Sequence, residues 1–396
     1  MKRILSPKRD RLLAKVCVFL VMAALISGMV GCTGDGYTPS KNLEIRTWYD
    51  LDDVRDNLAG HHILMNNLDS TSPGYIELAG QTANEGKGWQ PIANDPGANF
   101  TGTFDGQGYE IRDLFINRPD EYRVGLFSFV YEGAVIKNLG VTNITAICGG
   151  YSGGLAGTIN DCTVSNSHSS GNVTGSGFVG GLVGINSGNV NNCYATCNVT
   201  GSGLAGGLVG TNSGNVNNCY ATGNVTGGGP YVGGLIGANM GTVSKCYSTG
   251  SVTGTRCTGG LAGANGFYDP GTVSDSYSTG SVTGVDYVGG LVGVNYDSVV
   301  SNSYSTGSVT GSNFTGGLVG GNYTGAVSNS FWDTETSGQT TSAGGTGKNT
   351  TEMKDINTLS DVGWNIVAVA LNETNLAYAW NIVNNVTYPF LSWQAI

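Results

Sequence analysis

The tripeptide Gly-Gly-Leu recurs along the middle of the chain at a nearly constant spacing. It begins at Gly153, Gly180, Gly206, Gly233, Gly259, Gly289 and Gly316. Successive copies lie 27, 26, 27, 26, 30 and 27 residues apart, and a degenerate copy begins at Val124. A period of about 20–50 residues indicates a solenoid, a propeller or another repeat array, because each unit buries its apolar face against the next. The repeat therefore limits the possible folds more than any other feature of the sequence.

The content of one unit distinguishes these architectures. Residues 206–232 contain the short β-like segments "GGLVG", "NVNNCYAT" and "NVTG", which Gly, Asn and Ser separate. A propeller blade needs about 40 residues, and a leucine-rich repeat needs more than the one Leu of this unit. We therefore predict an all-β fold: a single parallel β-helix with about 26–27 residues per coil. A right-handed coil is expected by analogy with parallel crossovers.

Alternation within the unit predicts which side chains point inward. Cys219, Ala221, Gly223 and Val225 are small or apolar and suit a narrow interior, whereas the residues between them are polar or aromatic. Because coils stack in register, each outward residue should lie beside its equivalent in the next coil. The predicted outward ladder, which we treat as a candidate binding surface, comprises Tyr194, Tyr220, Tyr247, Tyr277, Tyr304, Thr196, Thr222, Thr249, Thr279 and Thr306. We expect its aromatic rings to face solvent about 5 Å apart.

Two further rows should point inward. The first comprises Val190, Val216, Val243, Val273, Val300 and Val327. The second comprises Cys193, Cys219, Cys246, Ser276, Ser303 and Ser330, three residues after each valine, so a turn or bulge must break the alternation between the rows. Since Cys and Ser exchange at one slot, we expect buried, reduced thiols rather than obligatory disulfides. No Cys-x-x-Cys pair exists, and neither a metal site nor a cofactor site is predicted.

The first 31 residues have the pattern of a secretory leader. A basic start precedes an apolar run of 15 residues, Val16 to Val30, which is shorter than the roughly 20 residues of a membrane span. The leader ends in "MVGC", which resembles a bacterial lipobox, so Cys32 is predicted to be acylated and to anchor the protein in a membrane, the outer membrane if the host is Gram-negative. Cleavage of an ordinary leader elsewhere is the alternative. Without residues 1–31 the net charge is −15, which argues against a nucleic-acid partner.

The ends of a β-helix need caps, because its terminal coils would otherwise present open strand edges. We assign residues 32–45 to a tether, 46–124 to the N-terminal cap and first coils, 125–342 to the repeats, and 343–396 to the C-terminal cap. A helix is expected over residues 50–60 with Asp50 as its N-cap, burying Leu51, Val54 and Leu58. A second is expected over residues 351–364, with Met353, Ile356 and Leu359 on its apolar face.

The repeat "GGLVGTNSGNVNNCYATGNVTG" resembles the GLUG motif, named for its Gly-Leu-x-Gly core. This family occurs in bacterial and archaeal surface proteins and in IgA-specific metallopeptidases. The upstream "FTGTFDGQGYEIRDLFI", and "FWDTETSGQTTSAGGTG" and "YPFLSW" downstream, resemble segments that flank such repeats. The resemblance implies a β-helical surface protein. It does not imply peptidase activity here, because His61 and His62 lack the His-Glu-x-x-His spacing.

Sequence matches to catalytic motifs are better explained by the repeat. "GSGFVG" and "GSGLAG" fit a dinucleotide-binding pattern but precede strands and recur with the unit. "GYSGG", residues 150–154, fits a nucleophile elbow, but His168 occupies the slot that is Tyr in later coils.

Carboxylates are the remaining candidates, since many β-helix proteins are polysaccharide lyases or hydrolases. Asp269, Asp297 and Arg256 could gather on one face, although their positions within the coil differ. Asp275 and Asp286 are expected in solvated turns. We therefore expect no catalytic site.

Three functions remain open. We expect a non-enzymatic, lipid-anchored cell-surface protein used in adhesion, in envelope structure or in binding a glycan or protein partner. The alternatives are a carbohydrate-active β-helix enzyme and a binder of an ordered surface, such as ice or a crystalline polysaccharide, to which regular Thr arrays could match.

Overall fold

The computed structural model describes residues 43–394. They belong to a compact unit that comprises Lys41–Ile396. The predicted leader, Cys32 and nearly all of the tether lie outside the described residues. None of the helices between residues 43 and 394 has the length and apolarity that a membrane crossing requires.

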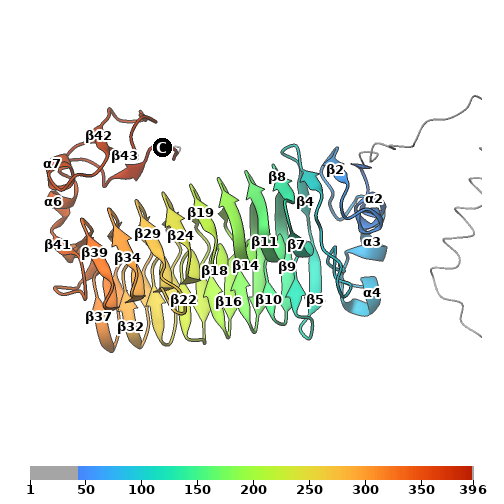
Figure 1. Ribbon diagram of the computed structural model, residues 1–396, viewed down its shortest axis with the longest axis horizontal. Coiled ribbons are helices and arrows are strands. Elements are labelled where there is room, and N and C mark those ends of the chain that lie inside the picture. Colours follow the sequence, from blue (N-terminus) through green and yellow to red (C-terminus); the bar gives the residue numbers. More distant parts are fainter. Residues whose placement is uncertain (1–42, 395–396) are drawn as a thin grey trace, which may run out of the picture. The chain divides into compact units, whose positions relative to one another are not determined.

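The repeats form the parallel β-helix that the sequence predicts (Figure 1). Its coils contribute strands to three parallel sheets of 17, 8 and 16 strands, here called sheets A, C and B. Sheet C takes one strand from each of eight coils. Residues at equivalent positions of successive repeats pair with each other. Ala205 pairs with Val232, Val209 with Ile236, and Tyr220 with Tyr247.

The strands have the following bounds. Sheet C contains β6 (Arg123–Val124), β10 (Tyr151–Ser152), β13 (Phe178–Gly180), β17 (Leu204–Gly206), β22 (Tyr231–Gly233), β27 (Cys257–Gly259), β32 (Asp286–Gly289) and β37 (Asn313–Gly316). Sheet A contains β1 (Leu43–Ile45), β2 (His61–Leu64), β3 (Thr103–Asp105), β7 (Phe127–Tyr131), β8 (Val135–Lys137), β11 (Ala156–Ser165), β14 (Val183–Asn191), β18 (Val209–Asn212), β19 (Asn215–Asn217), β23 (Ile236–Asn239), β24 (Thr242–Ser244), β28 (Ala262–Asn265), β29 (Thr272–Ser274), β33 (Val292–Tyr296), β34 (Val299–Ser301), β38 (Val319–Tyr323) and β39 (Ala326–Ser328). Sheet B contains β4 (Glu110–Arg112), β5 (Phe115–Arg118), β9 (Gly140–Cys148), β12 (His168–Gly175), β15 (Tyr194–Ala195), β16 (Asn198–Gly201), β20 (Tyr220–Ala221), β21 (Val225–Gly227), β25 (Tyr247–Ser248), β26 (Val252–Thr253), β30 (Tyr277–Ser278), β31 (Val282–Thr283), β35 (Tyr304–Ser305), β36 (Val309–Thr310), β40 (Phe331–Asp333) and β41 (Thr346–Lys348).

A left-handed residue marks the predicted break between the valine row and the Cys/Ser row. Asn192 and Asn218, each just before the Cys of its coil, have φ of +54° and +53°. Asn tolerates this region because its short side chain can bond locally to the backbone. Lys245, Asp275, Asn302 and Asn329 occupy the same corner of later coils with φ of +47° to +53°. The corner lets Val216 and Cys219 both point inward, and both are fully buried.

The second glycine of Gly-Gly-Leu is required by the close approach of successive coils. A Cβ on Gly207 would lie 2.1 Å from the carbonyl oxygen of Gly234 and 2.9 Å from the Cβ of Ala221. No larger side chain fits between these atoms without moving the backbone.

A ladder of asparagines, which the alternation pattern did not predict, runs through sheet A. Asn212 Nδ2 donates to Asn239 Oδ1 at 2.7 Å, and Asn239 Nδ2 donates to Asn265 Oδ1 at 2.8 Å. The whole ladder comprises Asn186, Asn212, Asn239, Asn265, Asn295 and Asn322, each donating to the next at 2.6–2.9 Å. Each side-chain amide forms hydrogen bonds with its neighbours in the ladder. The burial of these polar atoms is therefore compensated by hydrogen bonds.

The N-terminal cap differs in detail from the expectation. Helix α2 (Trp48–Asp52) and a 3₁₀ turn (Asp53–Asp56) replace the single helix expected over residues 50–60. The N-cap is Thr47, not Asp50: Asp50 N donates to Thr47 Oγ1 at 3.2 Å, and the Asp50 carboxylate accepts from Thr47 N at 2.9 Å. Asp50 thus completes a capping box from inside the helix. Two short helices, α3 (Tyr75–Leu78) and α4 (Ala83–Gly86), complete this end.

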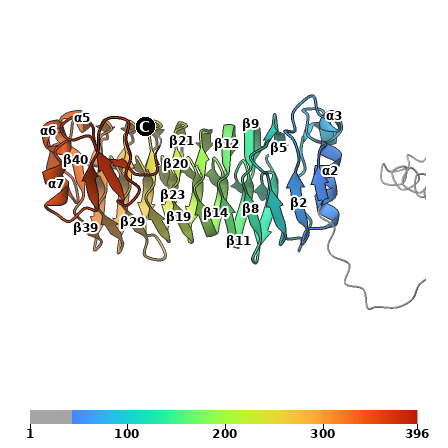
Figure 2. The same ribbon diagram turned by 90° about the horizontal axis from the view of Figure 1, so that it is seen from above.

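The C-terminal cap contains two short helices where one was expected. They are α6 (Thr350–Met353), which ends at its C-cap Lys354, and α7 (Ile356–Ser360), which begins after its N-cap Asp355. Met353 and Leu359 are buried as expected, and Ile356 packs beside them. The other elements are α5 (Thr334–Ser337), β42 (Ile366–Ala368), β43 (Trp380–Ile382) and β44 (Phe390–Leu391). Figures 1 and 2 show β42, β43 and the C-terminus turned back toward earlier coils.

Candidate binding surfaces

The predicted Tyr row forms one continuous stack on sheet B, which we call the Tyr ladder. His168 begins it, lying 4.6 Å from Tyr194 with the two rings tilted by 4°. From Tyr194 through Tyr220, Tyr247 and Tyr277 to Tyr304, successive ring centroids are 4.8, 4.9, 5.1 and 5.0 Å apart. The predicted spacing of about 5 Å is therefore present.

This geometry leaves the ring edges, and not the ring faces, available to a ligand. Neighbouring rings are tilted by no more than 7°, so each inner ring is covered on both faces by the rings before and after it. Aromatic pairs prefer offset or edge-to-face contacts, and the parallel arrangement is imposed by the pairing of the strands. A sugar ring cannot stack on such a face. The ladder presents hydroxyl groups instead.

The expectation that the whole ladder faces solvent is wrong for its C-terminal part. Tyr277 is 6% exposed and Tyr304 is 1% exposed, because the C-terminal cap covers them. Trp380 lies 6.0 Å from Tyr277 and 5.8 Å from Tyr304. Tyr304 donates to the carbonyl oxygen of Pro389 at 2.5 Å, and Gln394 Nε2 donates to the hydroxyl of Tyr277 at 2.6 Å.

The cap extends partway over the middle of the ladder. Trp393 lies 5.7 Å from Tyr247 and 6.2 Å from Tyr220, and both tyrosines remain half-buried. Burial, with the adjacent Tyr247 and Tyr194, raises the pKa of Tyr220 to about 12. Burial likewise raises the pKa of Tyr277 well above its usual range.

The accompanying Thr row is mostly exposed. Thr196, Thr222, Thr249 and Thr279 are exposed, and Thr306 is half-buried near the cap. We call Tyr194, Tyr220, Thr196, Thr222 and Thr249 the open ladder face. It carries hydroxyl groups that repeat once per coil.

A pocket lies where the cap meets the ladder. It has a volume of about 320 Å³, and its lining includes Tyr277, Thr279, Tyr304, Tyr388 and Gln394. Its walls come from both the coils and the C-terminal segment.

His168 lies in the Tyr slot, as predicted. Its Nε2 is 3.5 Å from Glu110 Oε1, and Arg112 Nε also donates to Glu110, at 2.7 Å. Burial lowers the pKa of His168, against the opposing effect of Glu110. Ser152, the serine of "GYSGG", is fully buried inside the coil. The residues of that motif therefore serve the fold.

The carboxylates singled out from the sequence lie in different surroundings. Asp269 and Asp297 are exposed, and Asp297 accepts from Thr324 Oγ1. Asp275 was expected in a solvated turn, but the cap partly covers it: its Oδ1 accepts from Trp380 Nε1 at 3.3 Å, and burial raises its pKa. Asp286 was also expected in a solvated turn, but it is the first residue of strand β32 and is half-buried, and its Oδ1 accepts from Asn313 Nδ2 at 2.8 Å. Among residues 43–394, no group of three or more His, Cys, Asp or Glu side chains could hold a metal ion.

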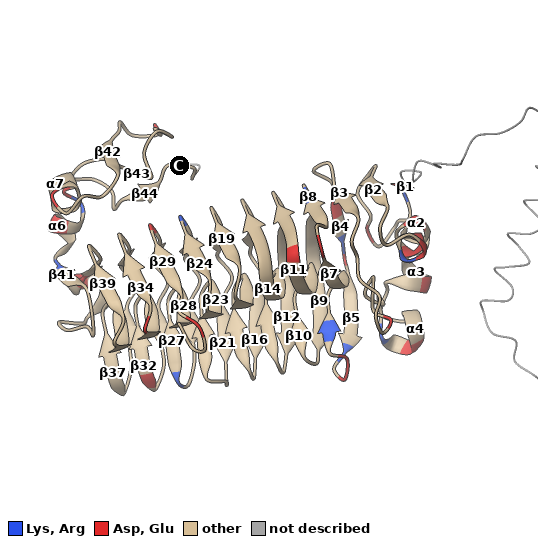
Figure 3. Cartoon of the chain, viewed as in Figure 1, with Lys and Arg blue, Asp and Glu red and all other residues tan. Residues whose placement is uncertain are grey.

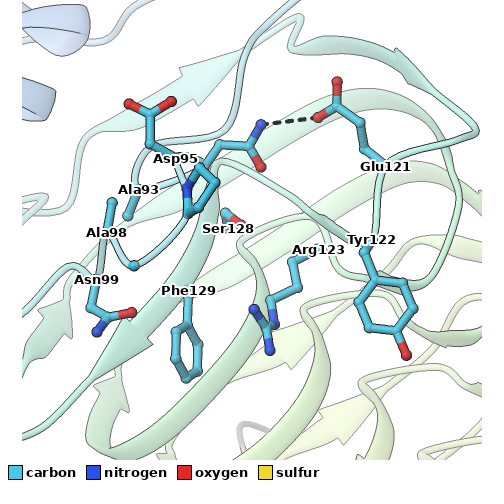
Figure 4. A pocket seen from close by; sticks show the side chains of 12 residues that line it. Ala93, Asp95, Ala98, Asn99, Glu121, Tyr122, Arg123, Ser128 and Phe129 are labelled. Carbon is cyan, nitrogen blue, oxygen red and sulfur yellow. Dashed lines mark hydrogen bonds between the residues drawn. The ribbon is translucent and has the colours of Figure 1, made fainter.

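A larger pocket near the N-terminal coils was not anticipated from the sequence (Figure 4). Its volume is about 460 Å³, and it lies between residues 93–99 and strands β6 and β7. Arg123 lies over the ring of Phe129 at 4.7 Å, and Asn94 Nδ2 donates to Glu121 Oε2 at 3.0 Å. Glu121 also pairs with Arg118, so its charge is already compensated.

The cysteines of the described coils are free and buried. Cys219 Sγ donates to the carbonyl oxygens of Asn217 and Val190 at 3.1 and 3.5 Å. Burial raises the pKa values of Cys148 and Cys162 to about 12. Cys193, Cys219 and Cys246 occupy the interior slot that Ser276, Ser303 and Ser330 fill in later coils, and all six are buried.

The fold therefore defines a parallel β-helix repeat protein. Residues 201–226, 228–253, 254–283 and 284–310 match the family model described as "The GLUG motif". The chain contains GLUG-motif repeats over these residues, and the resemblance found in the sequence is confirmed.

Curated relatives share part of the chain. It is similar to Halomucin of Haloquadratum walsbyi, with 38% identity over 155 residues, which is 38% of this chain and 2% of Halomucin. A protein of Evansella cellulosilytica described as a Gly-rich membrane protein is 35% identical over 217 residues, 44% of this chain and 24% of the relative. The chain thus spans a quarter or less of the length of these relatives. The relatives and the fold fit a cell-surface protein.

Two solved structures also show similarity. An "IgA1 Protease" chain has a TM-score of 0.43 at 15% identity, covering 76% of this chain and 22% of that one. A protein from Bacteroides ovatus, described as an immunoglobulin A1 protease, has a TM-score of 0.46 at 18% identity, covering 90% of this chain and 94% of that one.

Proposed function

We propose that the protein is a non-enzymatic, lipid-anchored cell-surface protein that binds an uncharged glycan through the open ladder face. Cys32 at the end of the leader is the attachment point for the lipid. The membrane description of the Evansella cellulosilytica relative supports this location. Acyl chains on Cys32 would hold the β-helix at the membrane with its coils exposed to the surroundings.

The observation that carries the proposal is the periodic hydroxyl face. Thr222 and Thr249 are exposed one coil apart, and Tyr220 and Tyr247 are stacked at 4.9 Å beside them. A polysaccharide is also a repeating chain of hydroxyl groups, so many equivalent hydrogen bonds can form along the coil axis. Each bond is worth about 1 kcal/mol or less in water, so useful affinity requires several at once.

Charge distribution favours an uncharged ligand. The central coils carry few charged side chains, and most charges lie toward the two ends (Figure 3). Asn198 and Asn224 extend the polar face without adding charge. An acidic polysaccharide would meet no cation on the open ladder face and would be repelled by the net charge of −15 that remains without residues 1–31.

The experiment is a glycan array probed with the full chain, together with a cleavage assay on the same polysaccharides. We expect retention on uncharged polymers, little retention on uronate-rich polymers, and no release of reducing ends or unsaturated products. Turnover that disappears in Asp269→Asn or Asp297→Asn would overturn the non-enzymatic assignment. Failure to retain any glycan would overturn the binding assignment.

A further inference from the structure

A second group of aromatic side chains lies on the outer surface of the coils, at the junction of sheets C and A in the C-terminal repeats. We call it the aromatic cluster. Two of its members, Phe314 and Tyr323, are 61% and 42% exposed. The cluster comprises Tyr287, Tyr296, Phe314 and Tyr323. The exposed rings of Phe267 and Tyr268 form a separate pair, which contacts Tyr231 of an earlier coil. The strands of the cluster, β32, β37, β33 and β38, belong to the last coils (Figure 1). Contiguous exposed aromatic side chains of this kind often mark a binding surface.

The repeat does not account for these residues. The partners Asn239 and Thr242 are separated by two residues in one coil, whereas their equivalents Asn265 and Thr272 are separated by six. Phe267 and Tyr268 lie in this insertion, which produces the single 30-residue spacing. Tyr296 and Tyr323 follow the Asn ladder directly, where earlier coils have Ser213 and Met240. Stacking of coils therefore does not require these aromatic rings.

The backbone is held in an unfavourable conformation at two of the rings. Tyr287 and Phe314 have φ of +53° and +49°. Their equivalents in earlier coils, such as Phe178, Leu204 and Tyr231, are not among the described residues with positive φ. The left-handed region is costly for a residue with a bulky side chain, and such strain concentrates at functional sites. The left-handed backbone at Tyr287 accompanies a close contact between its ring and Gly321, where an added Cβ would lie 2.7 Å from Tyr287 Cδ1.

The cluster has two short stacks that meet at an angle. Tyr287 and Phe314 stack at 4.7 Å with a 6° tilt, and Tyr296 and Tyr323 stack at 5.1 Å with an 18° tilt. Tyr287 and Tyr323 join the stacks at 6.1 Å and 58°, with their hydroxyl oxygens 2.8 Å apart. Phe314 lies on β37, the edge strand of sheet C. Because that sheet ends there, no later strand of it covers the outer face of the Phe314 ring, in contrast to the inner rings of the Tyr ladder.

Polar groups lie beside the rings at the same edge. Asp286 and Asn313 immediately precede Tyr287 and Phe314, and they are hydrogen-bonded to each other at 2.8 Å. Aromatic faces flanked by carboxylate and amide groups suit a ligand that combines apolar ring faces with hydroxyl groups, which describes a pyranose. A protein interface of ordinary size would need a larger surface with a more apolar centre. The flanking carboxylate disfavours an acidic sugar.

We propose that the aromatic cluster is a second ligand site, which binds a short uncharged oligosaccharide by stacking on Phe314 beside Tyr323. Asp286 accepts hydrogen bonds from the sugar hydroxyls, and Asn313 donates hydrogen bonds to them. The site is independent of the open ladder face, because it uses ring faces where the ladder offers hydroxyl groups.

Isothermal titration of the full chain with uncharged hexasaccharides tests the proposal. The probes are linear β-linked glucose, N-acetylglucosamine and mannose hexasaccharides, with a galacturonate oligosaccharide as the acidic comparison. We expect one of the uncharged probes to bind, with affinity reduced about tenfold by Phe314→Ala and restored by Phe314→Tyr. Tyr323→Ala should weaken the same interaction. Tyr122→Ala is the matched control, since Tyr122 is 62% exposed but lies at the other end of the coils.

The outcomes separate this site from the open ladder face. Thr222→Val/Thr249→Val should leave hexasaccharide binding unchanged, even if it abolishes retention on polymers. Absence of binding by every uncharged hexasaccharide, or equal binding by the parent and Phe314→Ala, would overturn the proposal. Self-association in sedimentation experiments that Phe314→Ala abolishes, without sugar binding, would overturn it in favour of a protein interface.

Discussion

Trp380 packs against Tyr304 with ring centroids 5.8 Å apart, which joins the C-terminal cap to the Tyr ladder. The same indole donates to Asp275 and lies 4.9 Å from Trp364. The C-terminal segment thus closes the β-helix and also covers the last rungs of its aromatic stack. A repeat array needs such an atypical end, because its last coil has no neighbour.

Trp380→Ala should destabilise the protein by about 3–5 kcal/mol, as expected for loss of a buried Trp. Chemical denaturation measures the change. Leu371→Ala is the control in the same segment, because Leu371 is exposed, and it should change stability by less than about 0.5 kcal/mol. Equal small effects of both variants would show that the cap does not stabilise the coils.

Asn239→Ala should cost about 2–5 kcal/mol, because it leaves the buried Oδ1 of Asn265 without its donor and removes the acceptor that Asn212 Nδ2 contacts at 2.7 Å. The control is Asn224→Ala on the exposed side of the coil. Denaturation midpoints of the two variants give the comparison. A loss below about 0.5 kcal/mol for Asn239→Ala would contradict the structural role of the Asn ladder.

Much of this architecture follows from local alternation in the sequence. The small inward set around Cys219 and Ala221 determines that Tyr220 and Thr222 point outward, and the constant period places each beside its equivalent. The Asn ladder also had a signal, since each member lies six residues after the first glycine of a Gly-Gly-Leu, as Asn212 does after Gly206. An inward position for this Asn can be predicted once its hydrogen-bond partner is recognised as the equivalent Asn of the next coil.

Contacts outside the period could not be predicted in this way. Nothing near Tyr304 in the sequence indicates that Trp380 covers it, because the cap has no repeat to fix its register. The aromatic cluster depends on the left-handed backbone at Tyr287, for which the sequence offers no turn residue. The pocket beside Arg123 likewise combines a loop and strands that lie apart along the chain.

The protein should lose stability above about pH 10. The folded state raises the pKa of Tyr220 to about 12, and that of Tyr277 rises further because it is buried. A raised pKa in the folded state means that the unfolded state loses its protons first, so stability is intact below about pH 10 and falls as the pH rises. Denaturation midpoints between pH 8 and 12, compared with those of Tyr220→Phe, test this. A midpoint that does not fall over this range would contradict the burial of the ladder.

Cys32→Ala should move the protein from the detergent phase to the aqueous phase in phase partitioning of the expressing cells. The acyl chains account for stable membrane attachment, because one lipidated residue with several chains binds far more tightly than a single chain. Cys17→Ala, within the leader, is the control and should leave partitioning unchanged. Partitioning of Cys32→Ala into detergent like the parent would contradict acylation at this residue.

The most direct test of the proposed function is retention of the full chain on insoluble uncharged polysaccharide, with two double variants compared. Thr222→Val/Thr249→Val removes two hydroxyls from the open ladder face, and Thr242→Val/Thr272→Val removes two from sheet A, where these threonines pair one coil apart. The first variant should lose about tenfold in affinity if each hydroxyl contributes about 0.7 kcal/mol, and the second should bind like the parent. Equal retention of both variants and the parent would contradict glycan binding through the open ladder face.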